Sequence, residues 1–245
     1  MAIEKVGTAQ VFNGPVSMPT DVGQDIAITP TAGNCIVIIA YIDALPASVT
    51  CSTVGGSATF TTVASQYGTG STMQVIVATN VLDDITAINV LPTGSGWGQV
   101  WMQEFSGVDN STPMDTTALT GSFNNTTSVQ APSITPVTVG ALVIDAVGSK
   151  TISNTSSPYP ATASGPTSVS GKMAGLGWTA ESDFWNTKTG NTTSANLSVG
   201  SNLVDALGAY QAGWVLAATP FAGSTVTAIA LRPYVPVENA FFTVL

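Results

Sequence analysis

The chain has 245 residues, of which 8% are charged and none is histidine, and its formal net charge at pH 7 is −9. These values argue against a coiled coil or a charge-driven disordered segment, and they exclude His-based catalytic triads and His-ligated metal sites. The five Lys and Arg residues are scattered singly. No basic stripe is present to neutralise phosphates, so we expect no nucleic-acid binding.

Short apolar runs separated by turn residues recur along the chain and predict about a dozen β-strands. The predicted strands are 25–29, 35–42, 59–64, 73–79, 87–90, 100–105, 129–134, 141–147, 172–179, 195–199, 212–218 and 225–231. Helical periodicity is absent from the longer segments, so at most one short helical turn is expected, near 81–85 or 201–207. The pattern predicts an all-β fold, an antiparallel two-sheet sandwich.

The predicted organisation is an N-terminal arm and first strand over 1–24, one β-sandwich domain over 25–232, and a C-terminal tail over 233–245. The segment 149–170 is rich in Ser, Thr and Pro and is long for a connection, which predicts an exposed functional loop or a disordered tip. The longest apolar run, 35–42, is far shorter than the roughly 20 residues of a membrane span. The first residues lack the pattern of a secretory signal, so we expect synthesis in the cytoplasm and no membrane partner.

Two segments in the two halves of the chain echo each other. Residues 30–40 and 136–146 both read as a proline, a short turn with a glycine (Gly33 and Gly140), and an apolar strand. The echo favours one sandwich with similar halves over two independent domains.

The two cysteines, Cys35 and Cys51, both lie in strand-like surroundings, and a hairpin between their strands would bring them close. The favoured interpretation is a pair of buried, reduced thiols, because free cysteine packs as a small hydrophobe. A disulfide is the alternative and requires an oxidising compartment.

Catalysis without histidine would depend on carboxylates, and a glycosidase needs two of them. Glu104 and Glu181 are the internal glutamates, and Glu104 beside Trp101 would suit a groove that cleaves or binds sugar. The favoured alternative places Glu104 at a strand end or on an outer face beside Thr, Ser and Asn. We therefore predict no enzymatic activity and no cofactor.

Two acidic pairs have the oxygen ligands that Ca²⁺ requires, Asp83-Asp84 and Asp109-Asn110. Neither follows the spacing of a calcium loop, and adjacent strand residues point to opposite sides. Solvated turns are the favoured interpretation, and we predict no metal site.

Partner binding is expected from apolar and aromatic residues near the termini and from two tryptophans in polar surroundings. The candidates are Val6, Val11, Phe12, Trp97, Trp185, Tyr234, Phe241, Phe242 and Leu245. The segment 6–12 is expected to lie beside the last strand.

The run Glu104-Phe-Ser-Gly-Val-Asp-Asn-Ser-Thr-Pro-Met-Asp115, followed by Gly121, resembles a signature of β-sandwich domains in phage virion proteins and bacterial surface proteins. In that signature a Gly-Asn/Asp strand lies upstream and a Gly-Ala-Leu-Val-Ile strand downstream, as at Gly33 and Gly140 here. The resemblance implies a jelly-roll or concanavalin-like sandwich. The acids are interpreted as structural, with Asp109 and Asp115 capping turn amides and Pro113 fixing the loop.

The resemblance and the low charge favour a virion structural protein, and among these a capsid cement or decoration protein. Such a protein binds the major capsid protein on the outer surface of the shell, and a trimer is the favoured oligomer. The alternatives are a carbohydrate- or receptor-binding tail or fibre protein, which would use Trp97, Trp185 and the 149–170 loop, and a glycanase dependent on Glu104 and Glu181.

Overall fold

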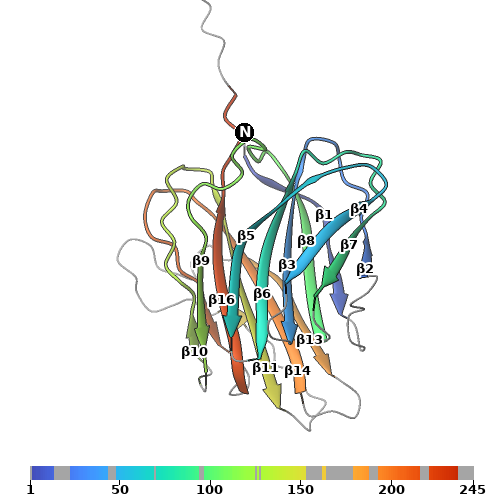
Figure 1. Ribbon diagram of the computed structural model, residues 1–245. Helices are drawn as coiled ribbons and strands as arrows, with labels where there is room; N and C mark the ends of the chain where they lie inside the picture. Colours follow the sequence, from blue (N-terminus) through green and yellow to red (C-terminus); the bar gives the residue numbers. More distant parts are fainter. Residues whose placement is uncertain are drawn as a thin grey trace, which may run out of the picture.

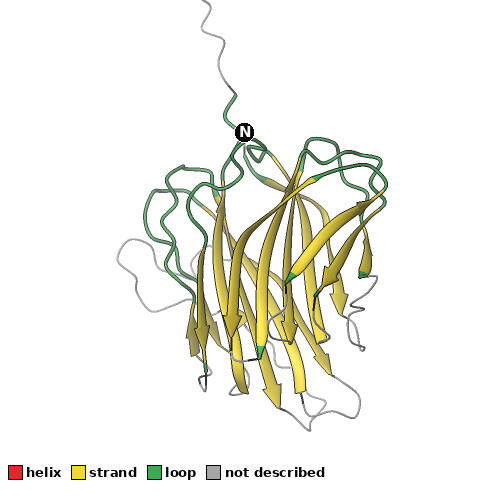
Figure 2. Cartoon of the chain, viewed as in Figure 1, coloured by secondary structure: helices red, strands yellow, loops and turns green. Residues whose placement is uncertain are grey.

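The computed structural model describes residues 2–13, 23–43, 48–68, 70–93, 97–124, 126, 128–152, 162–163, 179–187, 193–215 and 221–236. This part of the chain forms strands and connections without a helix, so it contains no helix able to cross a membrane (Figure 1). The strands run along the length of the molecule, and many of the connections between them gather at the end where the N-terminus lies (Figure 2).

Sixteen strands follow one another along the chain. The first eight are β1 (Glu4–Asn13), β2 (Gln24–Ala27), β3 (Cys35–Asp43), β4 (Val49–Val54), β5 (Thr59–Gly68), β6 (Ser71–Thr79), β7 (Ala87–Pro92) and β8 (Trp97–Ser106). The next eight are β9 (Leu119–Phe123), β10 (Ser128–Gln130), β11 (Leu142–Ile152), β12 (Thr162–Ala163), β13 (Thr179–Thr187), β14 (Thr193–Leu203), β15 (Gly213–Val215) and β16 (Phe221–Leu231).

These strands form four antiparallel sheets. In the first half of the chain, the five-stranded sheet has the order β1-β8-β3-β6-β5 and the three-stranded sheet the order β2-β7-β4. In the second half, the corresponding orders are β9-β16-β11-β14-β13 and β10-β15-β12. Adding eight to every strand number of the first half gives the second half, so the chain contains the same eight-stranded arrangement twice.

The four sheets are stacked through three apolar layers. The two five-stranded sheets face each other across a central cluster to which both halves contribute, with Val37 and Trp101 from one and Ile144 and Val199 from the other. Each five-stranded sheet packs its other face on the three-stranded sheet of its own half, as Ile38 does with Val90. The central strands of these sheets are therefore buried on both faces, which explains the apolar run of β3 and the burial of every residue of β6.

The two halves meet at equivalent residues. Tyr41 and Gly148 each lie six positions after the first residue of their central strands, β3 and β11. A Cβ atom on Gly148 would overlap the ring of Tyr41, so these residues are in direct contact. The contact therefore joins equivalent positions of the two halves. The edge contacts of β5 with β9 and of β13 with β1 are likewise equivalent to each other.

The structure confirms the all-β, antiparallel prediction and corrects several details. Four sheets replace the predicted two, because an apolar run does not reveal that both of its faces are covered. Neither 81–85 nor 201–207 is helical. The first strand pairs with β8 and not with β16. The predicted strand 172–179 lies outside the described residues except for Thr179, and the boundaries 1–24, 25–232 and 233–245 stay predictions.

The echo between the halves corresponds to real equivalence. Its two strands, β3 and β11, are the central strands of the two five-stranded sheets. Each follows a turn with a glycine of positive φ, +83° at Gly33 and +88° at Gly140, where a side chain would be strained. Each glycine N–H donates to a carbonyl just beyond a neighbouring strand, Val81 in one half and Val204 in the other.

Candidate functional site

A buried carboxylate holds the turn that precedes β3. Glu104 lies near the end of β8, is 6% exposed, and accepts hydrogen bonds at Oε1 from the Thr31 amide (2.8 Å) and from Asn34 Nδ2 (2.6 Å). The turn closes on itself through a hydrogen bond from the Asn34 amide to the Thr31 carbonyl. Glu104 thus satisfies donors that the turn leaves unpaired.

The pairing of Glu104 with Trp101 does not form. Trp101 belongs to the central cluster, whereas Glu104, three residues along the strand, projects to the opposite face with Met102. The alternative is confirmed in part: Glu104 lies near the end of β8 beside the predicted Thr and Asn, but it is buried and not on an outer face. Glu181 lies in β13, and its side chain is outside the described residues.

Asp109 organises the loop that follows β8. Its Oδ1 accepts from the amide of Ser111 (2.9 Å), from Ser111 Oγ (2.6 Å) and from the amide of Thr112 (3.3 Å). The hydrogen bond from Ser111 Oγ contributes most to lowering the pKa of Asp109, and the two amides and the charge of Arg232 add to it against partial desolvation. This is the turn capping that the sequence predicted.

Asp115 has the same role in the second half. It is 3% exposed, and its Oδ2 accepts from the amides of Val137 (2.6 Å) and Thr138 (3.1 Å) in the turn before β11. Arg232 lies beside it, with Nε 3.7 Å from Oδ1. Both prediction and structure assign Asp115 to turn capping.

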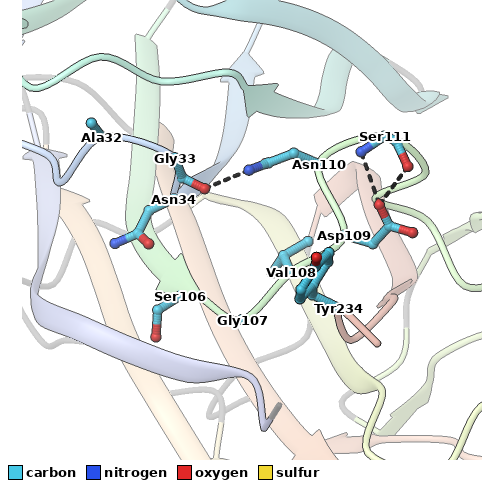
Figure 3. Close-up of a pocket in the computed structure, with 10 residues that line it drawn as sticks. All are labelled: Ala32, Gly33, Asn34, Ser106, Gly107, Val108, Asp109, Asn110, Ser111 and Tyr234. Atoms are coloured by element: carbon cyan, nitrogen blue, oxygen red, sulfur yellow. Dashed lines mark hydrogen bonds between the residues drawn. The ribbon is translucent and has the colours of Figure 1, made fainter. Parts of the chain in front are cut away.

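A pocket of about 430 Å³ opens between the Gly33 turn and the loop after β8 (Figure 3). Asn110 spans one side of it and donates from Nδ2 to the Gly33 carbonyl. Tyr234, which follows β16, forms another wall and is held by a hydrogen bond from its amide to the Gly107 carbonyl. The ten residues that line the pocket are Ala32, Gly33, Asn34, Ser106, Gly107, Val108, Asp109, Asn110, Ser111 and Tyr234.

The structure places only some of the predicted partner-binding residues at accessible sites. Val11 is half-buried against the central cluster, and Phe12 is half-buried against the apolar layer between the two sheets of the first half. Val6 lines a second, smaller pocket of about 240 Å³ beside Glu104. Tyr234 is 45% exposed and lines the larger pocket.

The remaining predicted contacts are not described at the side-chain level. Trp97 and Trp185 lie in β8 and β13, but their side chains fall outside the described residues, as do Phe241, Phe242 and Leu245 entirely. Most of the 149–170 loop is likewise outside them.

The cysteines are separate thiols. Cys35 lies in β3 and faces the central cluster, whereas Cys51 lies in β4, in a different sheet, and packs against the first-half core. The expected hairpin between their strands is therefore wrong, and the reduced state is confirmed. Burial raises the pKa of both thiols to about 12.

No group of three or more acidic or cysteine side chains that would hold a metal ion occurs within the described ranges. Asp83 and Asp84 form a turn, as the sequence favoured.

One buried acid was missed by the sequence analysis. Asp145 in β11 is fully buried between the two sheets of the second half, and Trp214 Nε1 donates to its Oδ1 at 2.7 Å. Burial raises the pKa of Asp145 well above its ordinary value, and the Trp214 hydrogen bond opposes this only in part. The sequence did offer a signal for Asp145, because it is an acidic residue inside an apolar strand. A carboxyl group buried in that way requires a hydrogen-bond donor beside it.

Comparison of the chain with protein-family models, with curated proteins and with solved structures gave no match in any of the three.

Proposed function

We propose that this chain is a non-enzymatic structural protein of a virion, a capsid cement or decoration protein that binds the outer surface of the shell. The observation that carries the proposal is the repeated strand order. In each half a sheet of order β1-β8-β3-β6-β5 faces one of order β2-β7-β4, or its equivalent eight strands later, and this order supports the proposal of a jelly roll. Jelly rolls are recurrent in viral capsid proteins and also in lectins.

The use of the acids supports a structural role. Glu104, Asp109 and Asp115, the acids of the signature, all accept hydrogen bonds from turns of this chain. Their oxygens stabilise the connections between the sheets, which is what a scaffold requires. Fold alone does not define function, so the proposal depends on a direct test.

The proposed mechanism is stabilisation by mass action. A protein that binds only the assembled shell shifts the equilibrium towards assembly. The proposed partner is the major capsid protein, and the proposed oligomer is a trimer.

The test is the copy number per particle, measured by quantitative mass spectrometry of virions purified from cells that express this chain. Hundreds of copies, comparable with the major shell protein, are expected. A handful would indicate a tail or fibre protein that recognises the host, and absence from particles would overturn the proposal.

A second test concerns the C-terminal candidates. Deletion of residues 239–245, which include Phe241, Phe242 and Leu245, is expected to leave a folded protein that no longer binds capsids in a co-sedimentation assay. Capsid binding equal to that of the full chain would contradict this part of the proposal.

A further inference from the structure

The pocket beside Tyr234 combines an apolar lining with a few polar groups. One N–H of each asparagine is engaged, that of Asn34 with Glu104 and that of Asn110 with the Gly33 carbonyl. Each asparagine keeps a second N–H beside its carbonyl oxygen. The hydrogen bonds to Asp109 all end on Oδ1, so its Oδ2 is left for a ligand.

The backbone donors around the pocket are also engaged. The amides of Gly33, Asp109 and Tyr234 donate to Val81, Arg232 and Gly107 carbonyls. Asp109 Oδ2 is an acceptor only, so a ligand that binds it must supply an N–H or O–H group.

The electrostatics favour a cation over a neutral molecule. Asp109 is the one ionisable acid among the ten lining residues, no lysine or arginine is among them, and the lowered pKa keeps its carboxylate charged at neutral pH. The formal net charge of the whole chain, −9, adds a field of the same sign.

The geometry adds an aromatic surface. Tyr234 is 45% exposed and is fixed by the pairing of Pro233 with Val108 next to it. Figure 3 shows Tyr234 on the same side of the pocket as Asp109, with Asn34 and Ser106 opposite. A planar cation that stacks on the ring would lie on the side of the pocket where Asp109 lies.

We propose that this pocket binds an arginine side chain of a partner protein, with the guanidinium against Tyr234 and Asp109. The guanidinium has five N–H donors in one plane and is more weakly hydrated than an ammonium, which suits a pocket of dispersed acceptors and an aromatic wall. This inference goes beyond the proposed function and holds wherever the partner is found.

The test is a titration of the ¹⁵N-labelled full chain with Nα-acetyl-L-arginine amide, followed by amide chemical shifts. Saturable shifts are expected at Gly33, Gly107 and Ser111. The matched neutral probe, Nα-acetyl-L-citrulline amide, has nearly the same shape and is expected to bind at least about tenfold more weakly. Affinity for the arginine probe should fall as NaCl is added.

The decisive variant is Asp109→Asn. Asparagine supplies the same Oδ1 to the turn, so the fold and the capping are kept, while the charge is lost. Affinity for the arginine probe is expected to fall about tenfold. Asp83→Asn, at a turn outside the pocket, is the control and should leave affinity unchanged.

Three results would overturn the inference: equal affinity for the arginine and citrulline probes, unchanged affinity in Asp109→Asn, or no shifts up to the solubility limit of the probe. Tighter binding of methyl glycosides than of the arginine probe would reassign the pocket to a neutral saccharide. None of these results depends on the copy number of the chain in virions, so the two proposals fail separately.

Discussion

Glu104 shows how a single side chain stabilises a connection in this fold. Its carboxylate accepts from a backbone amide and from an asparagine that lie some seventy residues earlier in the chain. Its removal would leave the Thr31 amide and the Asn34 side chain without their acceptor in a partly buried place. Hydrogen bonds to a charged group contribute about 1.5–3 kcal/mol each, and unsatisfied buried donors are costly.

Glu104→Ala is therefore expected to lower the free energy of unfolding by about 2–3 kcal/mol. Thermal unfolding should show a decrease in Tm of several degrees, at about 2–4 °C per kcal/mol for a chain of this size. Glu104→Gln keeps one acceptor oxygen and should lose less. Glu4→Ala, an exposed residue of the neighbouring strand β1, is the control. A Tm equal to that of the wild type in Glu104→Ala would contradict the assigned role.

Asp145 predicts a pH dependence whose sign follows from burial. Because burial raises its pKa in the folded state, the native protein holds a proton that the unfolded chain releases above about pH 3.9. The unfolded state then binds fewer protons, so stability falls as the pH rises from about 4 towards the folded-state pKa. Below about pH 3.9 both states are protonated and this contribution is constant.

Asp145→Asn should remove this fall, because its amide oxygen still accepts from Trp214 and carries no charge at any pH. At pH 7 the variant is expected to be more stable by about 1–3 kcal/mol. Urea unfolding at a series of pH values measures the effect, and Asp84→Asn serves as an exposed control. Parallel pH profiles for the wild type and Asp145→Asn would show that Asp145 does not titrate as described.

At the scale of elements, the contact between β3 and β11 sets the distance between the two central sheets. The Tyr41 ring occupies the space in which a side chain at position 148 would lie. Gly148→Ala forces a methyl group into the ring and is expected to destabilise the protein by about 1–3 kcal/mol.

The shorter side chain in Tyr41→Leu should relieve part of that overlap. A double-mutant cycle is expected to give a coupling energy of about 1 kcal/mol or more between the two positions. Gly121→Ala, in the edge strand β9, is the comparison variant, because an added Cβ would lie 3.3 Å from Val226 Cγ2, a tight contact but without the overlap found at Gly148. Additive losses in the cycle would show that the two residues do not share one space.

The strands themselves were largely predictable, and their partners were not. The apolar runs of β3, β6 and β16 gave strands close to the observed ones, because β-branched residues dominate them. β9 was missed, since Leu119-Thr-Gly-Ser-Phe123 has a glycine and little alternation. The roles of Asp109 and Asp115 were predictable, because both acids belong to the signature and were interpreted as turn caps. The position of Tyr234 was not predictable, since this residue reaches the pocket beside Asp109 from the far end of the chain.

At the scale of the whole molecule, the central cluster joins the halves into one cooperative unit. Val37 and Trp101 pack with Ile144 and Val199 from the other half, so unfolding of either half would expose the core of its neighbour. Each half also has its own outer core. The shared layer favours loss of both halves together.

A single unfolding transition is therefore expected for the full chain. Calorimetry should give equal calorimetric and van't Hoff enthalpies, and urea curves followed by far-UV circular dichroism and by tryptophan fluorescence should coincide. Two resolved transitions would mean that the outer cores hold each half without the shared layer.

The meeting of Tyr41 with Gly148 also determines which halves fit together. A pair of first halves would bring two tyrosine rings to the same point, and a pair of second halves would leave a hollow where both lack a side chain. Only the mixed pair fills that point once. Carrying one of each in a single chain thus supplies the fitting combination, and the contact disfavours pairing of like halves from two molecules.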